Sequence, residues 1–201
     1  MKRREFFKKA GAGSAALASL PGLAHIAAKR AQADDHGGKQ MGFRFVCVSQ
    51  AGTLGDVVHR INMNGCGTFS GASVEGSGAS VEGGGSYDHF DNAAPVPKTL
   101  LSAGNWKAVR VLTFDPIGTY GVLTAGILEL AVKLLQQFPS LAVIPATLKI
   151  VCSIGAAGLD TGQLEGFTLT VAGAPFGPFQ PILLAPGVTQ GITIFTNGWI
   201  P

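Results

Sequence analysis

Short runs in which apolar and polar residues alternate are the feature that most limits what this chain can fold into. A period of two places alternate side chains on opposite faces of a β-strand, whereas a helix repeats every 3.6 residues. Gly, Pro, Asn or Asp bounds each run. Short strands between such turn residues predict a single all-β, antiparallel domain over 43–201, folded as a barrel or a sandwich. The alternating or apolar runs are 43–48, 57–63, 106–114, 147–154, 166–171 and 191–196.

One segment, 126–138, fits a helix as well as a strand. Glu129 and Lys133 have the i,i+4 spacing of a helical ion pair. The apolar positions of the same segment, however, alternate strictly with the others. We favour a strand because Thr124 is the only N-cap residue of the usual kind near the start. The alternating apolar residues are Leu128, Leu130, Val132 and Leu134.

Two regions are rich in glycine. The seven residues at 70–76, Ser-Gly-Ala-Ser-Val-Glu-Gly, recur at 77–83 and predict a loop, a bulged strand or a slipped hairpin. They lack the sequence context of a phosphate-binding loop. The second region, 172–187, has too many prolines for a central strand. Its phenylalanines are expected to pack over a barrel end, or else to line a ligand mouth.

The charge of the chain is unevenly distributed. Of 15 Lys and Arg and 12 Asp and Glu, seven basic residues and one acidic residue precede position 34. Residues 34–201 therefore carry eight basic and eleven acidic groups, a net charge of −3. Such a domain has no cluster of Lys and Arg that could bind phosphate groups, so we expect no nucleic-acid partner. A hydrophobic content of 46% also excludes intrinsic disorder.

The N-terminus has the layout of an export signal. A basic stretch, Lys2 to Lys9, precedes a weakly apolar run over 10–28, and small residues at Ala31 and Ala33 supply a cleavage site. Arg3, Arg4, Phe6 and Lys8 match the pattern of twin-arginine translocation signals, which the segment resembles. Phe7 replaces the usual Leu, and Lys2 replaces the usual Ser or Thr.

This resemblance implies that residues 1–33 are a signal peptide read by the twin-arginine translocase. The exported protein is then periplasmic or secreted, begins at Asp34, and carries a flexible leader over 34–42. We expect no transmembrane segment in the mature form. The longest apolar candidate, 122–135, is interrupted by Gly126, Glu129 and Lys133.

The most suggestive chemical cluster combines residues from two expected strands. On a strand, Tyr87, His89 and Asp91 share one face, and His59 lies on an earlier strand. His59, His89 and Asp91 are the candidate catalytic residues, as an oriented acid–base pair or as metal ligands. A turn with a surface hydrogen bond is the competing interpretation of this stretch.

Other candidate residues are less specific. Arg60, Arg110 and Tyr87 are candidate ligand-binding residues, although an arginine in such a strand more commonly lies at a rim. Cys47 and Cys152 fit buried strand positions, and Cys66 lies in a more open context. The three cysteines allow one disulfide, which the sequence does not assign.

These observations predict an exported barrel without a cofactor, acting as a binding or envelope-associated structural module. An eight-stranded barrel has room for a small apolar ligand. The alternative is a barrel enzyme of isomerase, cyclase or hydrolase type that uses the His/Asp site, with or without a metal. Self-association through weakly charged strand edges is a third possibility.

Overall fold

The computed structural model describes residues 40–52, 59–70, 79–91 and 99–198, which belong to the unit His36–Pro201. The expected signal peptide, 1–33, and the leader up to residue 39 lie outside the described residues. Met41 and Gly42, which the sequence assigns to the leader, already form the start of the first strand. None of the helices in the described ranges has the length and apolar character needed to cross a bilayer.

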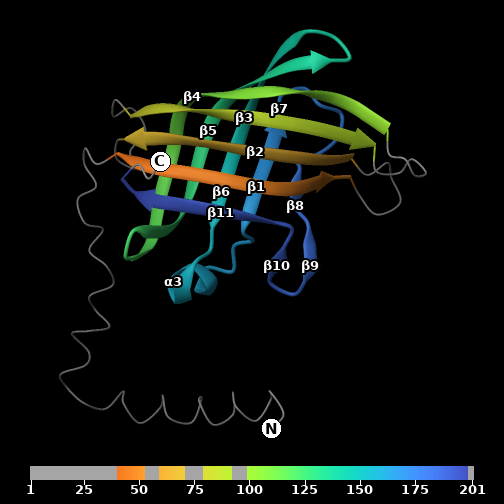
Figure 1. The fold of residues 1–201 in the computed structure, drawn as a ribbon. Helices are drawn as coiled ribbons and strands as arrows, with labels where there is room; N and C mark the ends of the chain where they lie inside the picture. Colours follow the sequence, from red (N-terminus) through yellow and green to blue (C-terminus); the bar gives the residue numbers. More distant parts are fainter. Residues whose placement is uncertain (1–39, 53–58, 71–78, 92–98, 199–201) are drawn as a thin grey trace, which may run out of the picture. The chain divides into compact units, whose positions relative to one another are not determined.

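The described chain is built almost entirely of strands, as the alternation predicts (Figure 1). A single short helix, α3 (Gly155–Asp160), interrupts them. The strands are β1 (Met41–Ala51), β2 (His59–Ser70), β3 (Ser80–Asp91), β4 (Thr99–Tyr120), β5 (Leu123–Phe138), β6 (Ala142–Cys152), β7 (Gly166–Val171), β8 (Gln180–Pro181), β9 (Leu183–Ala185), β10 (Val188–Thr189) and β11 (Gly191–Asn197).

The main sheet is antiparallel, and it closes partly on itself as a barrel. Its order is β11-β1-β2-β3-β4-β5-β6-β7, so β1 to β7 form a meander and β11 returns beside β1. At one place β11 also pairs with β5. At another, Phe179 exchanges two backbone hydrogen bonds with Leu169 of β7 while β8 pairs with β1. The segment Phe179–Pro181 thus joins the two sides of the sheet.

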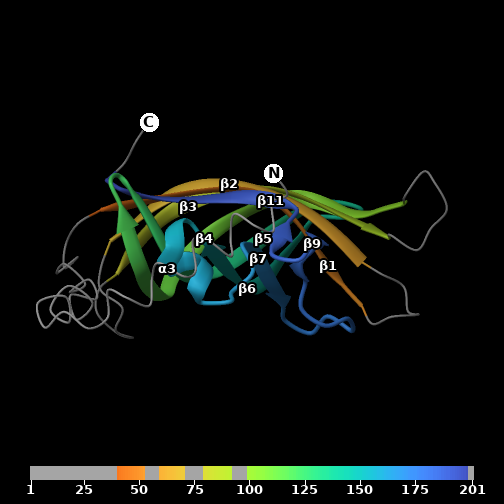
Figure 2. The same ribbon diagram turned by 90° about the horizontal axis from the view of Figure 1, so that it is seen from below.

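The strands lie in two layers that cross steeply. β1, β2, β3 and β11 run across the front in Figure 1, whereas β5, β6 and β7 run behind them in another direction. The view from below separates the two layers (Figure 2). The long strand β4 belongs to both layers because it contains four register shifts, each of which bends a strand.

The contested segment 126–138 is a strand, which confirms the prediction. β5 pairs with β4 on one side and β6 on the other. Leu128, Leu130, Val132 and Leu134 are all buried, and the residues between them are more exposed. The period of two therefore outweighed the helical spacing of Glu129 and Lys133.

Aromatic side chains fill the interior. Trp106 packs against Phe43 and Phe45, with ring centroids 6.4 and 5.8 Å apart, and Phe45 packs against Phe167 at 5.8 Å. Phe69, Phe114 and Phe195 continue the cluster. All of these rings are buried. A closely packed core therefore occupies the volume in which the barrel prediction expected a small apolar ligand.

Glycines in β2 and β3 provide the space for these rings. A Cβ at Gly65 would lie 2.9 Å from Cε2 of Trp106, and a Cβ at Gly67 or Gly83 would lie 2.8 Å from a ring atom of Phe43. Gly83 ends the second copy of the repeat, and 80–83 form the start of β3. Residues 71–78, the rest of the expected loop, lie outside the described residues. The glycines of these strands permit close packing rather than a phosphate contact.

Candidate functional site at one end of the barrel

His59 and His89 form a hydrogen-bonded pair of imidazoles. His59 begins β2, and His89 lies near the end of β3, which pairs with β2. The Nδ1 atom of His59 lies 2.9 Å from Nε2 of His89. Asp91, the Cα partner of His59 in this register, is also half-buried. The antiparallel pairing thus brings together the three residues that the sequence identified as catalytic candidates.

Two phenylalanines from the segment after β7 enclose the imidazoles. The Phe176 ring lies 4.4 Å from the His59 ring and 5.5 Å from the His89 ring, centroid to centroid. Phe179 meets the edge of His89 at 5.3 Å and is 1% exposed. Both phenylalanines belong to the Pro-rich region 172–187, which the sequence expected to pack over a barrel end or to line a ligand mouth. His59, His89, Phe176 and Phe179 are called the imidazole cluster below.

The surroundings of His89 favour its neutral form. Burial and, to a smaller extent, the charge of His59 lower the pKa of His89 to about 4, whereas Asp91 acts in the opposite direction. At neutral pH His89 therefore carries one ring proton. Its Nδ1 atom lies 3.4 Å from the Ser102 hydroxyl of β4. These contacts form a chain from Ser102 through His89 to His59. The single ring proton of His89 can lie on either of its nitrogens, and the Ser102 hydroxyl and the His59 ring then donate or accept accordingly.

Tyr87 adds a buried hydroxyl beside this chain. It lies two residues before His89 on the same face of β3 and is buried. Its hydroxyl makes no hydrogen bond of ordinary geometry. Burial raises the pKa of Tyr87 against a smaller, opposing effect of Ser102. Ser102 acts on the pKa of Tyr87 as a hydrogen-bond partner, so Tyr87 lies beside the contact between Ser102 and His89.

The two candidate arginines do not join the cluster. Arg60 lies on the opposite face of β2 from His59, between Gln50 of β1 and Phe90 of β3. Its Nε atom is buried without a hydrogen bond. Arg110 is exposed, although strict alternation places it on the face of buried Trp106. The register shift between Ala108 and Arg110 breaks that alternation and turns Arg110 outward.

The cysteines occupy the environments that their contexts predicted. Cys47 and Cys152 are buried, Cys66 is exposed, and all three are free thiols. The Sγ atoms of Cys47 and Cys152 donate to carbonyl oxygens of β11. Burial raises the pKa of Cys47 to about 12 and also raises that of Cys152, so both remain protonated thiols at neutral pH.

Sequence reasoning found only part of this site. It selected the imidazoles, Asp91 and Tyr87 from their alternation, and it identified the phenylalanine-rich segment without connecting it to them. It missed Ser102, which no local motif distinguishes. Within the described ranges, no three His, Cys, Asp or Glu side chains are arranged to hold a metal ion.

Comparisons with family models, curated proteins and solved structures found no match to this chain.

Proposed function

We propose that this chain is an exported binding protein whose ligand site is the imidazole cluster at the end of the barrel. The observation that carries the proposal is the His59–His89 hydrogen bond of 2.9 Å within a wall of phenylalanine rings. Polar groups held in apolar surroundings cost stability, and they concentrate at functional sites. The site combines flat apolar surfaces with a few hydrogen-bonding groups, which is typical of small-molecule sites.

The chemistry of the site favours a small ligand with an aromatic or planar apolar part and one hydrogen-bonding group. The Phe176 ring offers a face or an edge for stacking. The imidazole pair offers a donor or an acceptor, depending on the ring tautomers. Because side chains fill the interior, the ligand is expected at the barrel end and not along the barrel axis.

Titration with indole, p-cresol and benzoate, followed by NMR of the imidazole ring protons, tests this proposal. We expect the signals of both His59 and His89 to shift with at least one of these probes. Phe176→Ala should weaken that binding about tenfold, because it removes the stacking surface. Phe138→Ala, which removes an exposed phenylalanine outside the cluster, should leave binding unchanged. Unchanged histidine signals with all three probes would contradict the proposal.

The proton chain from Ser102 through His89 to His59 favours acid–base catalysis as a second candidate function. A histidine that stays neutral well below pH 6 can accept a proton from a substrate under conditions in which a free imidazole is protonated. Isomerase, cyclase and hydrolase reactions all use such a step. In this candidate His59 and His89 exchange protons with the substrate, while Asp91 opposes the loss of positive charge at His89.

Hydrolysis of p-nitrophenyl acetate is a direct probe of this second candidate. Catalysis by His89 should persist down to about pH 4, follow the pKa of that residue and be lost in His89→Gln. A rate that falls near pH 6.5 and survives His89→Gln would point to an ordinary surface histidine and would exclude this candidate.

A further inference from the structure

The β5–β6 hairpin projects from the barrel (Figure 1). Its tip carries exposed apolar side chains. Phe138 is 46% exposed, Leu141 86% and Val143 63%. The turn is held by a hydrogen bond from Nε2 of Gln136 to the carbonyl oxygen of Ser140, 3.0 Å long. Apolar side chains so exposed on an ordered hairpin indicate a surface that another structure covers.

The sequence around this tip has no charge over fifteen residues. No Asp, Glu, Lys or Arg occurs from 134 to 148, and a lysine stands at each side, Lys133 and Lys149. Lys149 faces Glu129 across the strand pair. Lys133 differs, because the residue opposite it on the neighbouring strand β4 is another lysine, Lys107.

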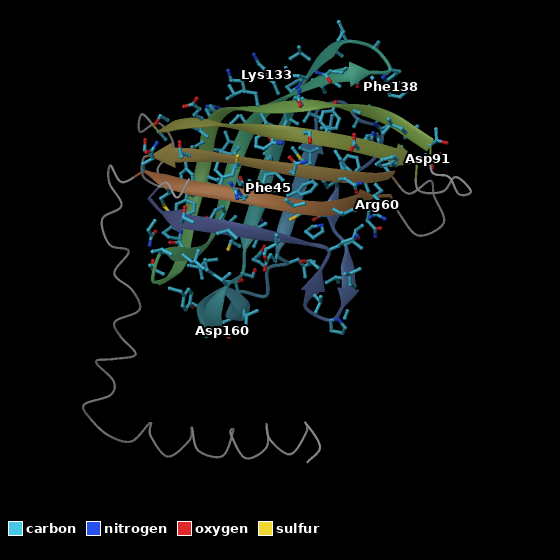
Figure 3. All side chains as sticks on the ribbon, in the orientation of Figure 1. Phe45, Arg60, Asp91, Lys133, Phe138 and Asp160 are labelled. Carbon is cyan, nitrogen blue, oxygen red and sulfur yellow. The ribbon has the colours of Figure 1, made fainter. Side chains whose placement is uncertain are left out.

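Lys107 and Lys133 are exposed and directly opposite each other in the β4–β5 register. Like charges in this position destabilise a sheet. In the described parts of the chain neither ammonium group makes an ion pair. On the same face of the sheet, the next pair toward the hairpin tip is Leu135 of β5 and Val143 of β6. The two lysines therefore lie directly behind a pair of apolar side chains. Lys133 and Phe138 lie on the same projecting strand (Figure 3).

We propose that this surface, consisting of Phe138, Leu141, Val143, Lys107 and Lys133, docks on a membrane that carries anionic lipid headgroups. Apolar side chains of interfacial elements enter the headgroup and acyl boundary to a depth of about 5–10 Å. Lys133 lies five residues before Phe138, roughly 17 Å along an extended strand. Its long side chain can extend toward the headgroups. An anionic surface also relieves the repulsion between the two lysines, whereas a second copy of the chain would add two more lysines.

A fluorophore on the hairpin tip tests the proposal. Leu141→Cys, in a Cys66→Ser background, is labelled with nitrobenzoxadiazole; the remaining cysteines are buried. Vesicles of phosphatidylcholine with phosphatidylglycerol should raise the emission of this label severalfold, and phosphatidylcholine alone should not. Lys107→Gln and Lys133→Gln should each weaken vesicle binding about fivefold. The matched control is the same label at Val46→Cys, an exposed apolar position on β1 (59% exposed, against 86% for Leu141), whose emission should not change.

Each other outcome would overturn the proposal. An equal response to both vesicle types would show that the lysines have no role. An equal response at position 46 would show tethering without insertion of the tip. Emission that rises with protein concentration in the absence of vesicles would identify a second copy as the occupant. No residue of the imidazole cluster belongs to this surface, so failure here leaves the proposed ligand site standing.

Discussion

The ionisation of His89 makes the stability of this protein depend on pH. Its pKa of about 4 in the folded chain lies below the value of about 6.5 expected when the chain is unfolded. Between these values the unfolded state binds more protons, so the free energy of unfolding falls as the pH is lowered from about 6.5 to 4.

We therefore expect acid to destabilise the protein through this residue, and His89→Gln to remove the effect. The difference in pKa corresponds to about 3 kcal/mol, which solvent screening of a half-buried group reduces to about 1–2 kcal/mol. Urea unfolding at pH 7 and at pH 4.5 measures this loss of stability. The glutamine variant should lose less stability than the parent between the two pH values. Parallel losses in both proteins would contradict this prediction.

Gly65 is expected to tolerate no side chain, because the Trp106 ring lies against it. Gly65→Ala should lower the free energy of unfolding by about 1–3 kcal/mol through overpacking. Gly177→Ala is the matched control, since a Cβ there meets no atom within 4 Å, and it should be close to neutral. Thermal unfolding compares the two variants. A neutral Gly65→Ala would show that Trp106 has room to move.

Among the elements, the short segment Phe179–Pro181 joins β7 to β1 and also covers the imidazoles. Phe179 is 1% exposed, so Phe179→Ala should cost about 3–5 kcal/mol. Phe138→Ala, at the exposed end of β5, should cost less than about 1 kcal/mol. Urea unfolding measures both variants, and similar losses would mean that the segment does not hold the barrel closed.

The strands show how far pattern alone predicts an element. β5 follows strict alternation, and its buried leucines are the expected ones. β4 does not, because four register shifts interrupt it and turn Arg110 outward. A bulge depends on how two partner strands meet, and so it leaves no signal in the alternation of one strand.

For the molecule as a whole, the proposed export requires a domain that folds before it is moved. All three cysteines are free, so the fold needs no disulfide and can form in a reducing compartment. Loss of the arginine pair should then block export without affecting the fold. The change is Arg3→Lys together with Arg4→Lys, which keeps the charge but removes the planar guanidinium groups.

Expression in a bacterium that has the twin-arginine translocase, followed by fractionation and N-terminal sequencing, measures the result. The parent should be recovered outside the cytoplasm and begin at Asp34, while the double variant stays in the cytoplasm with Met1. A matched change of Lys9 and Lys29 to arginine, two basic residues outside the matched pattern, should not stop export. An exported double variant, or an exported parent that begins at Met1, would contradict the prediction.

The sequence by itself determined the class of fold and the buried face of β5. It could do so because burial on one side of a strand requires a period of two, which is a local property. It also selected His59, His89 and Asp91. The repeat was harder to interpret, because glycine in a strand and glycine in a loop look alike until a partner ring is known.

Only the tertiary structure decided how the sheet closes and which side chains fill the interior of the barrel. Pairing of β2 with β3 placed His59 beside His89, and the return of the chain after β7 brought Phe176 and Phe179 to the same place. Ser102 joined them through the register of β4. These contacts join residues far apart in the chain. Their free energy depends on packing and desolvation, which are properties of the assembled barrel and not of any single segment.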